Sequence, residues 1–571
     1  MMKFYKKIKI NNINEYEPVY IANSDDMRKM DEHAVKILNI SFTELMEIAA
    51  KSAFACISEY INFNKSDFQN MSIVILCGTG NNGGDGYVLG KLFADSEYSE
   101  KSVTSIAVLN ISDKPPRSEA ALFHYNRLNS LKGLKNSNDI KILSCIELSD
   151  ENLQEIFFGS DIIIDAVFGT GFKGALEGEA LRVIKFANDA HNHKANKNKL
   201  RIAVDVPSGV DCDSGKASAY SFEADMTLTF EFIKRGLVSY PGAEYAGEVV
   251  VVPIGFTQQT REIINKHSIL LSPDYIKNIF DNRRNKRKFK NTNKGDFGKL
   301  LAICGSENMT GAAYLSAMGA LRTGVGLLYL ASDRKIMPVL QSKLNEPVFI
   351  PLDYNYNNCY DNNAEQIINI LSEDAFDSVL IGPGLGLENG EKIISSLKKI
   401  NYSNHNHRAK TIIFDADGIN ALCGNINILH EVKVEKILTP HPGEMLRLCR
   451  AAGFDIKSVS DVQEDRMNIS AAFAEKYNCI LVLKGAGTVI AAPNGDIYIN
   501  STGNPGMSKG GSGDILAGMI ASYCAQGIKP TDSACLAVYF HGMAGDIAAE
   551  RYSETGMIPS DMLNILAEIQ K

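Results

Sequence analysis

Residues 72–86 read SIVILCGTGNNGGDG, an apolar β-branched run followed at once by a glycine-rich turn. The same change from apolar run to polar turn recurs at 102–110, 161–169, 201–209 and 248–256, with longer helical patterns between the runs. This alternation predicts parallel strands joined by helical crossovers, an α/β fold. Ligands of such sheets lie beyond the carboxyl ends of the strands, so the residues after each run are the candidates for chemistry.

The turn after the first run contains five glycines within residues 78–86. Glycine allows φ > 0 and lets backbone N–H groups approach a phosphate. The turn formally contains GxGxxG, but the next run ends at Asn110 instead of the acid that would hold a ribose 2′-OH. This disfavours an ordinary dehydrogenase and leaves a dinucleotide ligand open. The structural alternative is a tight strand-to-helix turn, although Asn81, Asn82 and Asp85 supply more polar groups than such a turn requires.

Two further strand ends carry oxygen-bearing side chains. DAVFGTGFKG places Asp165 ahead of three glycines, and VDVPSGVD places Asp205 and Ser208 around a proline turn. Asn82, Asp165 and Ser208 offer hard oxygen ligands, which suit a monovalent or divalent cation. Lys234, in FEFIKRGL, follows the next strand, where a functional and a solvated lysine are equally compatible with the spacing.

Alternation of strands and helices resumes from residue 299, and its most informative segment is GMSKGGSGDILAGMIASY. Gly510, Gly511 and Gly513 come just before Asp514 and a helical pattern, so free N–H groups at a helix start would surround a phosphoryl group. A carboxylate there is suited to act as base for a hydroxyl that attacks phosphorus. The alternative is that Asp514 only caps the helix.

Four other strand ends would complete this rim. KGAGT, at 484–488, suits nucleotide phosphate or ribose contacts, and His441 in HPGE is as compatible with structure as with function. GPGLG at 382–386 and DADGIN at 415–420 would each, alone, indicate only a turn.

Length and composition limit the possible architectures and binding partners of the chain. A chain of 571 residues exceeds a single core, so at least two domains are expected, and the basic run at 281–298 is interpreted as a solvated linker. The net charge of −8 disfavours nucleic acid, the scattered cysteines fit a reducing cytosol, and no apolar run is long enough for a membrane span. We expect a soluble cytoplasmic protein and a homo-oligomer.

The motifs of the first part resemble the NAD(P)H-hydrate epimerase family over roughly residues 20–265, with Thr79 in place of a usual proline. The resemblance implies a Rossmann-like three-layer domain that interconverts the R and S hydrates of NADH and NADPH (NADHX and NADPHX). It implies K⁺ on Asn82, Asp165 and Ser208, and Asp205 as acid/base with Lys234 as a second catalytic group. The implied substrate contacts are Asn81, Asn82, Gly83, Gly84, Asp85, Gly169, Thr170, Gly171, Phe172, Lys173, Gly174, Ala175 and Asp205.

TGAAYLSAMGALRTGVG together with the five rim motifs resembles the ADP-dependent NAD(P)H-hydrate dehydratase family, a ribokinase-like α/β fold. The resemblance implies Mg²⁺ and ADP, a catalytic Asp514, and a hydrate site lined by Ala312, Gly386, His441 and Asp514. The implied nucleotide contacts are Lys484, Gly485, Ala486, Gly487, Thr488 and Gly513. Asn293 and Cys304 depart from the usual histidine and glycine of this family.

Both resemblances in one chain are typical of bifunctional NAD(P)H-hydrate repair enzymes, with an epimerase domain at 1–270 and a dehydratase domain at 271–571. An epimerase would feed a dehydratase that accepts only the S epimer. The alternative is a vitamin-type hydroxymethyl kinase fused to a non-catalytic Rossmann-like binding or dimerisation module.

Overall fold

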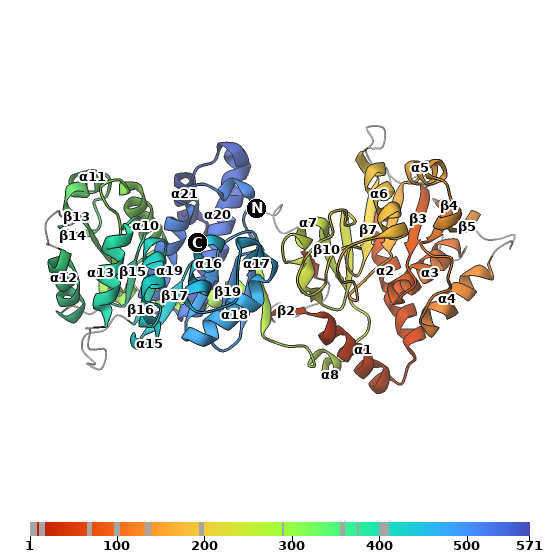
Figure 1. Ribbon diagram of the computed structural model, residues 1–571, viewed down its shortest axis with the longest axis horizontal. Coiled ribbons are helices and arrows are strands. Elements are labelled where there is room, and N and C mark those ends of the chain that lie inside the picture. Colours follow the sequence, from red (N-terminus) through yellow and green to blue (C-terminus); the bar gives the residue numbers. More distant parts are fainter. Residues whose placement is uncertain are drawn as a thin grey trace. The chain divides into compact units, whose positions relative to one another are not determined.

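The computed structural model describes residues 8–10, 18–64, 71–95, 103–131, 139–192, 199–287, 290–353, 360–373, 376–398 and 410–570. The chain divides into two compact units. The first comprises Met1–Asn14 and Tyr20–Lys266, and the second comprises Glu15–Val19 and His267–Lys571. Figure 1 shows both units, each built from a sheet with helices around it.

The first unit is built on one parallel sheet with the strand order β1-β10-β8-β7-β6-β3-β4-β5. Its strands are β1 (Ile8–Ile10), β3 (Met71–Cys77), β4 (Val103–Asn110), β5 (Asp139–Ser144), β6 (Ile162–Ala166), β7 (Leu200–Val204), β8 (Met226–Phe230) and β10 (Glu248–Val252). A short strand, β2 (Val19–Ala22), pairs in parallel with β9 (Ile233–Lys234).

The helices of the first unit are α1 (Ser24–Leu38), α2 (Phe42–Phe63), α3 (Asn81–Ala94), α4 (Glu119–Asn129), α5 (Asp150–Phe158), α6 (Gly178–Asn192), α7 (Gly242–Tyr245) and α8 (Gln258–Arg261), with 3₁₀ turns at Cys145–Glu147 and Arg235–Leu237.

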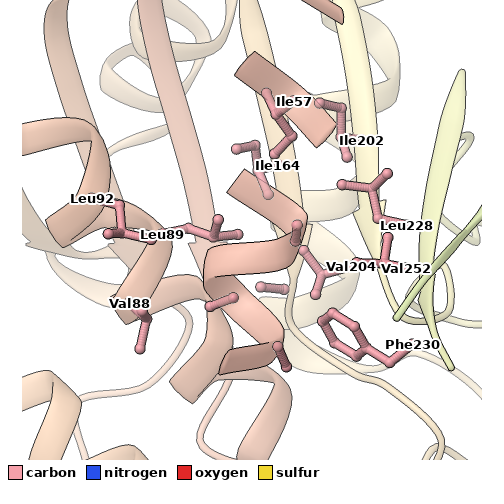
Figure 2. Packing of buried hydrophobic residues seen from close by; sticks show 14 of the residues in the cluster. Ile57, Val88, Leu89, Leu92, Ile164, Ile202, Val204, Leu228, Phe230 and Val252 are labelled. Carbon is pink, nitrogen blue, oxygen red and sulfur yellow. The ribbon is translucent and has the colours of Figure 1, made fainter. Parts of the chain in front are cut away.

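Helices cover both faces of this sheet. On one face, Ile57 of α2 and Leu89 of α3 pack with Ile164 and Ile202 of the sheet (Figure 2). On the other face, α5 and α6 contribute a second buried apolar cluster. Neighbouring residues of β3 belong to opposite clusters, because successive side chains of a strand point to opposite faces. The predicted three-layer Rossmann-like architecture is confirmed.

The second unit has a mixed sheet with the order β14-β13-β12-β15-β16-β17-β18-β19-β20-β11. The strands are parallel except that β19 runs antiparallel to both β18 and β20. Their bounds are β11 (Ser268–Leu271), β12 (Lys299–Ile303), β13 (Leu327–Asp333), β14 (Val348–Leu352), β15 (Ser378–Ile381), β16 (Thr411–Phe414), β17 (Glu435–Leu438), β18 (Ile480–Leu483), β19 (Val489–Ala491) and β20 (Ile497–Asn500).

The helices of the second unit are α9 (Pro273–Arg287), α10 (Thr310–Thr323), α11 (Met337–Lys343), α12 (Tyr360–Glu373), α13 (Leu387–Leu397), α14 (Asp417–Gly424), α15 (Ile428–Glu431), α16 (Pro442–Ala451), α17 (Val459–Glu464), α18 (Arg466–Tyr477), α19 (Ser512–Ala525), α20 (Pro530–Gly556) and α21 (Pro559–Ile569), with 3₁₀ turns at Lys294–Phe297, Arg334–Ile336 and Pro505–Met507.

Close packing of α10 on α19 fixes the helix that carries Asp514. A Cβ on Gly319 would lie 2.5 Å from the carbonyl oxygen of Ile515, and one on Gly518 would lie 2.1 Å from that of Ser316. Glycine at both positions lets the two backbones approach. The predicted ribokinase-like α/β class of this unit is confirmed by its mixed, mostly parallel sheet with helical connections.

The interpretation of 281–298 as a linker is wrong for much of its length. Residues 281–287 continue helix α9, which begins at Pro273, and Lys294–Phe297 form a 3₁₀ turn. Residues 288–289 lie outside the described residues. A run of basic residues does not break a helix, since lysine and arginine are good helix formers.

Among the helices described, none has the length and apolar character that a bilayer crossing needs.

Candidate active sites

Asp165 and Ser208 form a buried oxygen cluster at the ends of β6 and β7. Ser208 donates from its N–H to Oδ2 of Asp165 and from its hydroxyl to Oδ1, both at 2.7 Å. The hydroxyl oxygen of Ser208 accepts from the N–H of Phe168 at 2.9 Å. Burial raises the pKa of Asp165 to about 6 against these hydrogen bonds, and no cationic side chain of the described residues offsets its charge.

Asn82 lies on the same side of the sheet, in the first turn of α3. Its Nδ2 donates to the carbonyl of Val204 at 3.2 Å, which fixes the amide plane. A Cβ on Gly169 would lie 3.3 Å from Oδ1 of Asn82 and 3.3 Å from Oδ2 of Asp205. Glycine at 169 therefore keeps open the space that both oxygens face.

The glycines of 78–86 have a different role from the one predicted. None of them has a positive φ. A Cβ on Gly83 would lie 1.9 Å from the carbonyl oxygen of Gly78, one on Gly84 would lie 2.3 Å from Sδ of Met46, and one on Gly86 would lie 2.7 Å from Sγ of Cys77. These three glycines let α3 pack tightly on its neighbours, while the N-cap residue Gly80 has open space around it. The start of α3 has no side-chain cap, so its N–H groups are free for a ligand.

Asp205 and Lys234 form a buried ion pair, with Nζ of Lys234 2.7 Å from Oδ1 of Asp205. The ammonium also donates to the carbonyl of Phe230 at 2.6 Å. The Lys234 side chain is 0% exposed and that of Asp205 is 12% exposed. A solvated lysine is therefore excluded, and Oδ2 of Asp205 is the free end of the pair. Asp205 has φ 69°, a conformation rare for a residue with a side chain.

Asp85 and Asp31 are two further carboxyl groups near this pair. Burial raises the pKa of Asp85 well above its ordinary value, and the charges of Asp205 and Asp31 raise it further. Burial also raises the pKa of Asp31 to about 7, against the charge of Lys234. Asp31 was not predicted from the sequence, because it lies within helix α1 and does not follow a strand.

The loop 169–175 runs across the surface beside these groups. Phe172 is buried, whereas a Cβ on Gly171 or Gly174 would meet open space. Lys173 ties the loop down through Asp211 at 3.0 Å and Asp213 at 2.7 Å. In the same segment, Thr170 is half-buried and Ala175 is exposed.

In the second unit, the glycine nest (residues 510–513) leads into α19. Gly511 precedes the helix with φ 100°, and no side-chain cap covers the free N–H groups of its first turn. Asp514 is therefore not the N-cap residue of α19, because it lies inside the first turn of the helix. Burial and the charge of Asp415 raise the pKa of Asp514 and the charge of Lys484 lowers it, with a net result of about 6.

Lys484 lies beside the nest. Its Nζ is 2.7 Å from Oδ1 of Asp415 and 3.9 Å from Oε2 of Glu444, and a Cβ on Gly513 would lie 3.4 Å from Nζ. Burial lowers the pKa of Lys484, but Asp415 and Glu444 raise it by more, so the ammonium stays charged. DADGIN was predicted to complete the rim of the site, but the role of Asp415 as the partner of Lys484 was not predicted.

The loop 484–488 turns on two glycines, Gly485 with φ 142° and Gly487 with φ 58°. Thr488 donates its hydroxyl to the carbonyl of Gly485 at 2.9 Å and closes the turn around Ala486. Arg466 supports it from behind, donating to the carbonyl of Leu483 at 2.9 Å and that of Lys484 at 3.3 Å.

The other three residues expected to line the hydrate site with Asp514 each lie at the start of a helix, α10, α13 or α16. Ala312 lies in α10, and a Cβ on Gly384 would come within 2.8 Å of the Ala312 Cβ. Gly386 donates its N–H to Oδ2 of Asp417 at 2.8 Å. His441 caps α16, since its Nδ1 accepts from the N–H of Gly443 at 3.0 Å. His441 thus has a structural role and still presents a half-exposed ring.

The two departures from the dehydratase pattern have clear positions. Asn293 caps the 3₁₀ turn Lys294–Phe297, accepting at Oδ1 from the N–H of Gly295 at 2.9 Å. Cys304 is buried after β12, where burial and the charge of Asp514 raise the pKa of its thiol. In the described part of the chain, no group of three or more His, Cys, Asp or Glu side chains could hold a metal ion.

Two chemically different sites on two α/β units are typical of a bifunctional enzyme. Residues 42–236 match the family described as YjeF-related protein N-terminus, and residues 300–568 match the family described as NAD(P)H-hydrate dehydratase.

The chain is 33% identical over 563 residues to the bifunctional NAD(P)H-hydrate repair enzyme of Moorella thermoacetica, covering 96% of each protein. It is 32% identical to the Escherichia coli enzyme of the same name, covering 97% of this chain and 94% of that protein. A Bacillus subtilis ADP/ATP-dependent NAD(P)H-hydrate dehydratase crystallised with ATP and Mg²⁺ is 26% identical, covering 51% of this chain and 97% of that chain with a TM-score of 0.40. The chain belongs to the family of bifunctional NAD(P)H-hydrate repair enzymes.

Proposed function

We propose that this chain repairs hydrated nicotinamide cofactors at two sites, an epimerase in residues 1–270 and a dehydratase in residues 271–571. The observation that carries the proposal is similarity along 96% of the chain to an enzyme that combines both activities. The substrates are NADHX and NADPHX, and ADP is the second substrate of the dehydratase, entering with Mg²⁺ on its phosphates.

In the epimerase, Asp205 is the group suited to move a proton at the hydrated ring. Its Oδ1 is held by Lys234, so Oδ2 alone faces the space beside Gly169. The ion pair with Lys234 fixes the orientation of the carboxylate, which a general base requires. The free N–H groups at the start of α3 and the loop 169–175 would hold the rest of the dinucleotide.

The oxygen cluster of Asn82, Asp165 and Ser208 fits K⁺. Asp165 is a buried carboxylate without a cationic partner among the described side chains, and Ser208 and Asn82 add neutral oxygens. Hard oxygen donors suit such an ion. When bound, K⁺ would supply a positive charge that compensates Asp165 and favours anionic groups of the substrate.

In the dehydratase, hydroxide is a poor leaving group, which explains the need for a nucleotide. The hydroxyl oxygen of the S hydrate attacks the β-phosphorus of ADP, its proton passes to Asp514, and AMP leaves with the electron pair of the broken P–O bond. The new phosphate ester then loses inorganic phosphate, and loss of a proton from the neighbouring ring carbon restores NAD(P)H. The N–H groups of the glycine nest stabilise the charge on the transferred phosphoryl group.

The decisive experiment supplies a mixture of R and S hydrates with ADP and Mg²⁺ and follows the absorbance of reduced nicotinamide. Complete recovery of NAD(P)H from both epimers, with one phosphate released per turnover, is expected. A stable phosphorylated alcohol without NAD(P)H would instead identify a kinase. Recovery that stops when the S epimer is consumed would mean that the first unit does not epimerise.

A further inference from the structure

Asp415, Lys484 and Asp514 carry charges of alternating sign and follow one another along the sequence of the second unit; Asp415 is buried, and the other two are partly buried. Asp415 follows β16, Lys484 follows β18, and the nest with Asp514 opens α19. Asp415 binds Lys484 at 2.7 Å, and the ammonium lies 3.4 Å from the position a Cβ would take on Gly513.

Hydrogen bonds inside the protein hold the buried side chain of Asp415 in place. Its side chain is 2% exposed, and its Oδ1 accepts from the hydroxyl of Thr439 at 2.6 Å as well as from Lys484. The next residue, Ala416, has φ 46°, a backbone conformation that costs energy for a residue with a Cβ. Lys484 is the more exposed member of the pair, at 19%.

We infer that Asp415 is a positioning residue that holds the Lys484 ammonium beside the glycine nest, where it contacts the phosphoryl group in transit from ADP to the hydrate. The inference rests on the proposed dehydratase function. A phosphoryl group in transfer carries negative charge on its oxygens, and a fixed cation in a site shielded from water stabilises that charge.

The same pair acts electrostatically on Asp514. The negative charge of Asp415 raises the pKa of Asp514 and the positive charge of Lys484 lowers it. The other charged or titratable groups facing this site are Asp417 from α14, Glu444 and His441 from α16, Cys304 after β12 and His541 from α20. Among the described ion pairs of Lys484, the one with Asp415 is the shorter, at 2.7 Å, and the one with Glu444 measures 3.9 Å.

The two charges can therefore be removed separately with opposite effects. Lys484→Met leaves Asp415 uncompensated, so protonation of Asp514 becomes easier and the acidic limb of the dehydration rate against pH moves up by about 1 pH unit. Asp415→Asn leaves Lys484 with only the more distant carboxylate of Glu444, at 3.9 Å, and moves that limb down by about 1 pH unit. In Lys484→Met, kcat also falls by roughly 10²-fold, the scale for one group that stabilises transition-state charge.

The test measures kcat and KM for ADP against pH in the full chain, with the S hydrate as substrate. Since each single variant leaves a buried charge without its partner, Asp415→Asn/Lys484→Met is included; it removes both charges and should restore the limb while kcat stays low. Asp377→Asn is the matched control, because Asp377 pairs with Lys410 at 2.6 Å outside the site. Epimerisation by the first unit and a melting curve report folding.

The inference is supported if the acidic limb of the pH–rate profile moves up in Lys484→Met and down in Asp415→Asn. An unmoved limb in both single variants, or a change confined to KM for ADP, overturns it. Asp514→Asn separates this failure from a failure of the proposed function. If that variant is inactive while the limb stays unmoved, Asp514 remains the base and Asp415 and Lys484 are structural. If Asp514→Asn dehydrates at the parent rate, the proposed function itself fails.

Discussion

Each unit contains a buried aspartate–lysine pair with the same 2.7 Å separation, but the two pairs are oriented in opposite senses. In the first unit Lys234 is 0% exposed and Asp205 is 12% exposed. In the second unit Asp415 is 2% exposed and Lys484 is 19% exposed. The first pair presents a carboxylate to its ligand space, and the second presents an ammonium.

This inversion follows the chemistry that each unit is proposed to perform. An epimerase moves a proton at a ring and needs a base, whereas a phosphoryl-transfer site must accommodate negative charge and needs a cation. In both pairs the more buried member holds the other in position. The proton acceptor of the second unit is accordingly a third residue, Asp514, outside the pair.

The largest effect on activity is expected from replacement of Asp205, the carboxylate that the pair of the first unit presents. Asp205→Asn removes the proton acceptor, so epimerisation falls by roughly 10²- to 10⁴-fold. Dehydration of the S hydrate, measured on the same preparation, stays at the parent rate because it occurs in the other unit. Parent-rate conversion of R to S would make Asp205 a structural turn residue.

The matching change in the second unit is Asp514→Asn. It retains size but cannot accept a proton, so dehydration of the S hydrate falls by roughly 10²-fold or more. Nucleotide binding and epimerisation persist, as measured by ADP titration and conversion of the R hydrate. Asp532→Asn, which changes an acid in the first turn of α20, is the control and retains dehydration. A parallel loss of epimerisation would contradict the independence of the two sites.

A smaller effect is expected from Gly169→Ala, which fills the space that Asp205 faces. The added Cβ would lie 3.3 Å from both Asn82 Oδ1 and Asp205 Oδ2, tighter than a normal contact. Overpacking of this kind costs about 1–3 kcal/mol, and about 1.4 kcal/mol, near the lower end of that range, corresponds to roughly 10-fold slower epimerisation. Gly424→Ala, in a roomy part of α14, is the control. Unchanged epimerisation in Gly169→Ala would place the substrate elsewhere.

The smallest effect concerns the cation of the first unit. At a K⁺ concentration of 100 times Kd, binding adds about 2.7 kcal/mol of stability, or roughly 5–10 °C in the melting temperature of a domain of this size. The measurement compares the full chain in K⁺ and in tetramethylammonium, and Asp165→Asn should abolish the difference. Identical melting and epimerisation in both salts would remove the proposed site.

Sequence patterns identified the strands whose carboxyl ends are followed by candidate site residues, because buried parallel strands followed by polar turns are distinctive. They missed β5, which is followed by no glycine-rich motif. Lys234 stayed ambiguous because its burial depends on Asp205, a contact between residues far apart in the chain. Asp415 was found as a position but not as a partner, since pairing across strand ends depends on the order of strands in the sheet. The glycines of 78–86 were located correctly, but their packing function depends on neighbours such as Met46 and Cys77.

The packing of Gly83, Gly84 and Gly86 has a consequence for the interpretation of genetic variation in this chain. A methyl group at any of the three would come within 2.7 Å of an atom of another residue, yet the same segment carries Asn82 and Asp85. A mutational scan of residues 78–86 that measures activity alone would therefore not distinguish a misplaced helix α3 from the loss of a ligand contact. Inherited changes there are best assigned to one cause or the other by protein abundance, which a misplaced helix lowers and a lost contact does not.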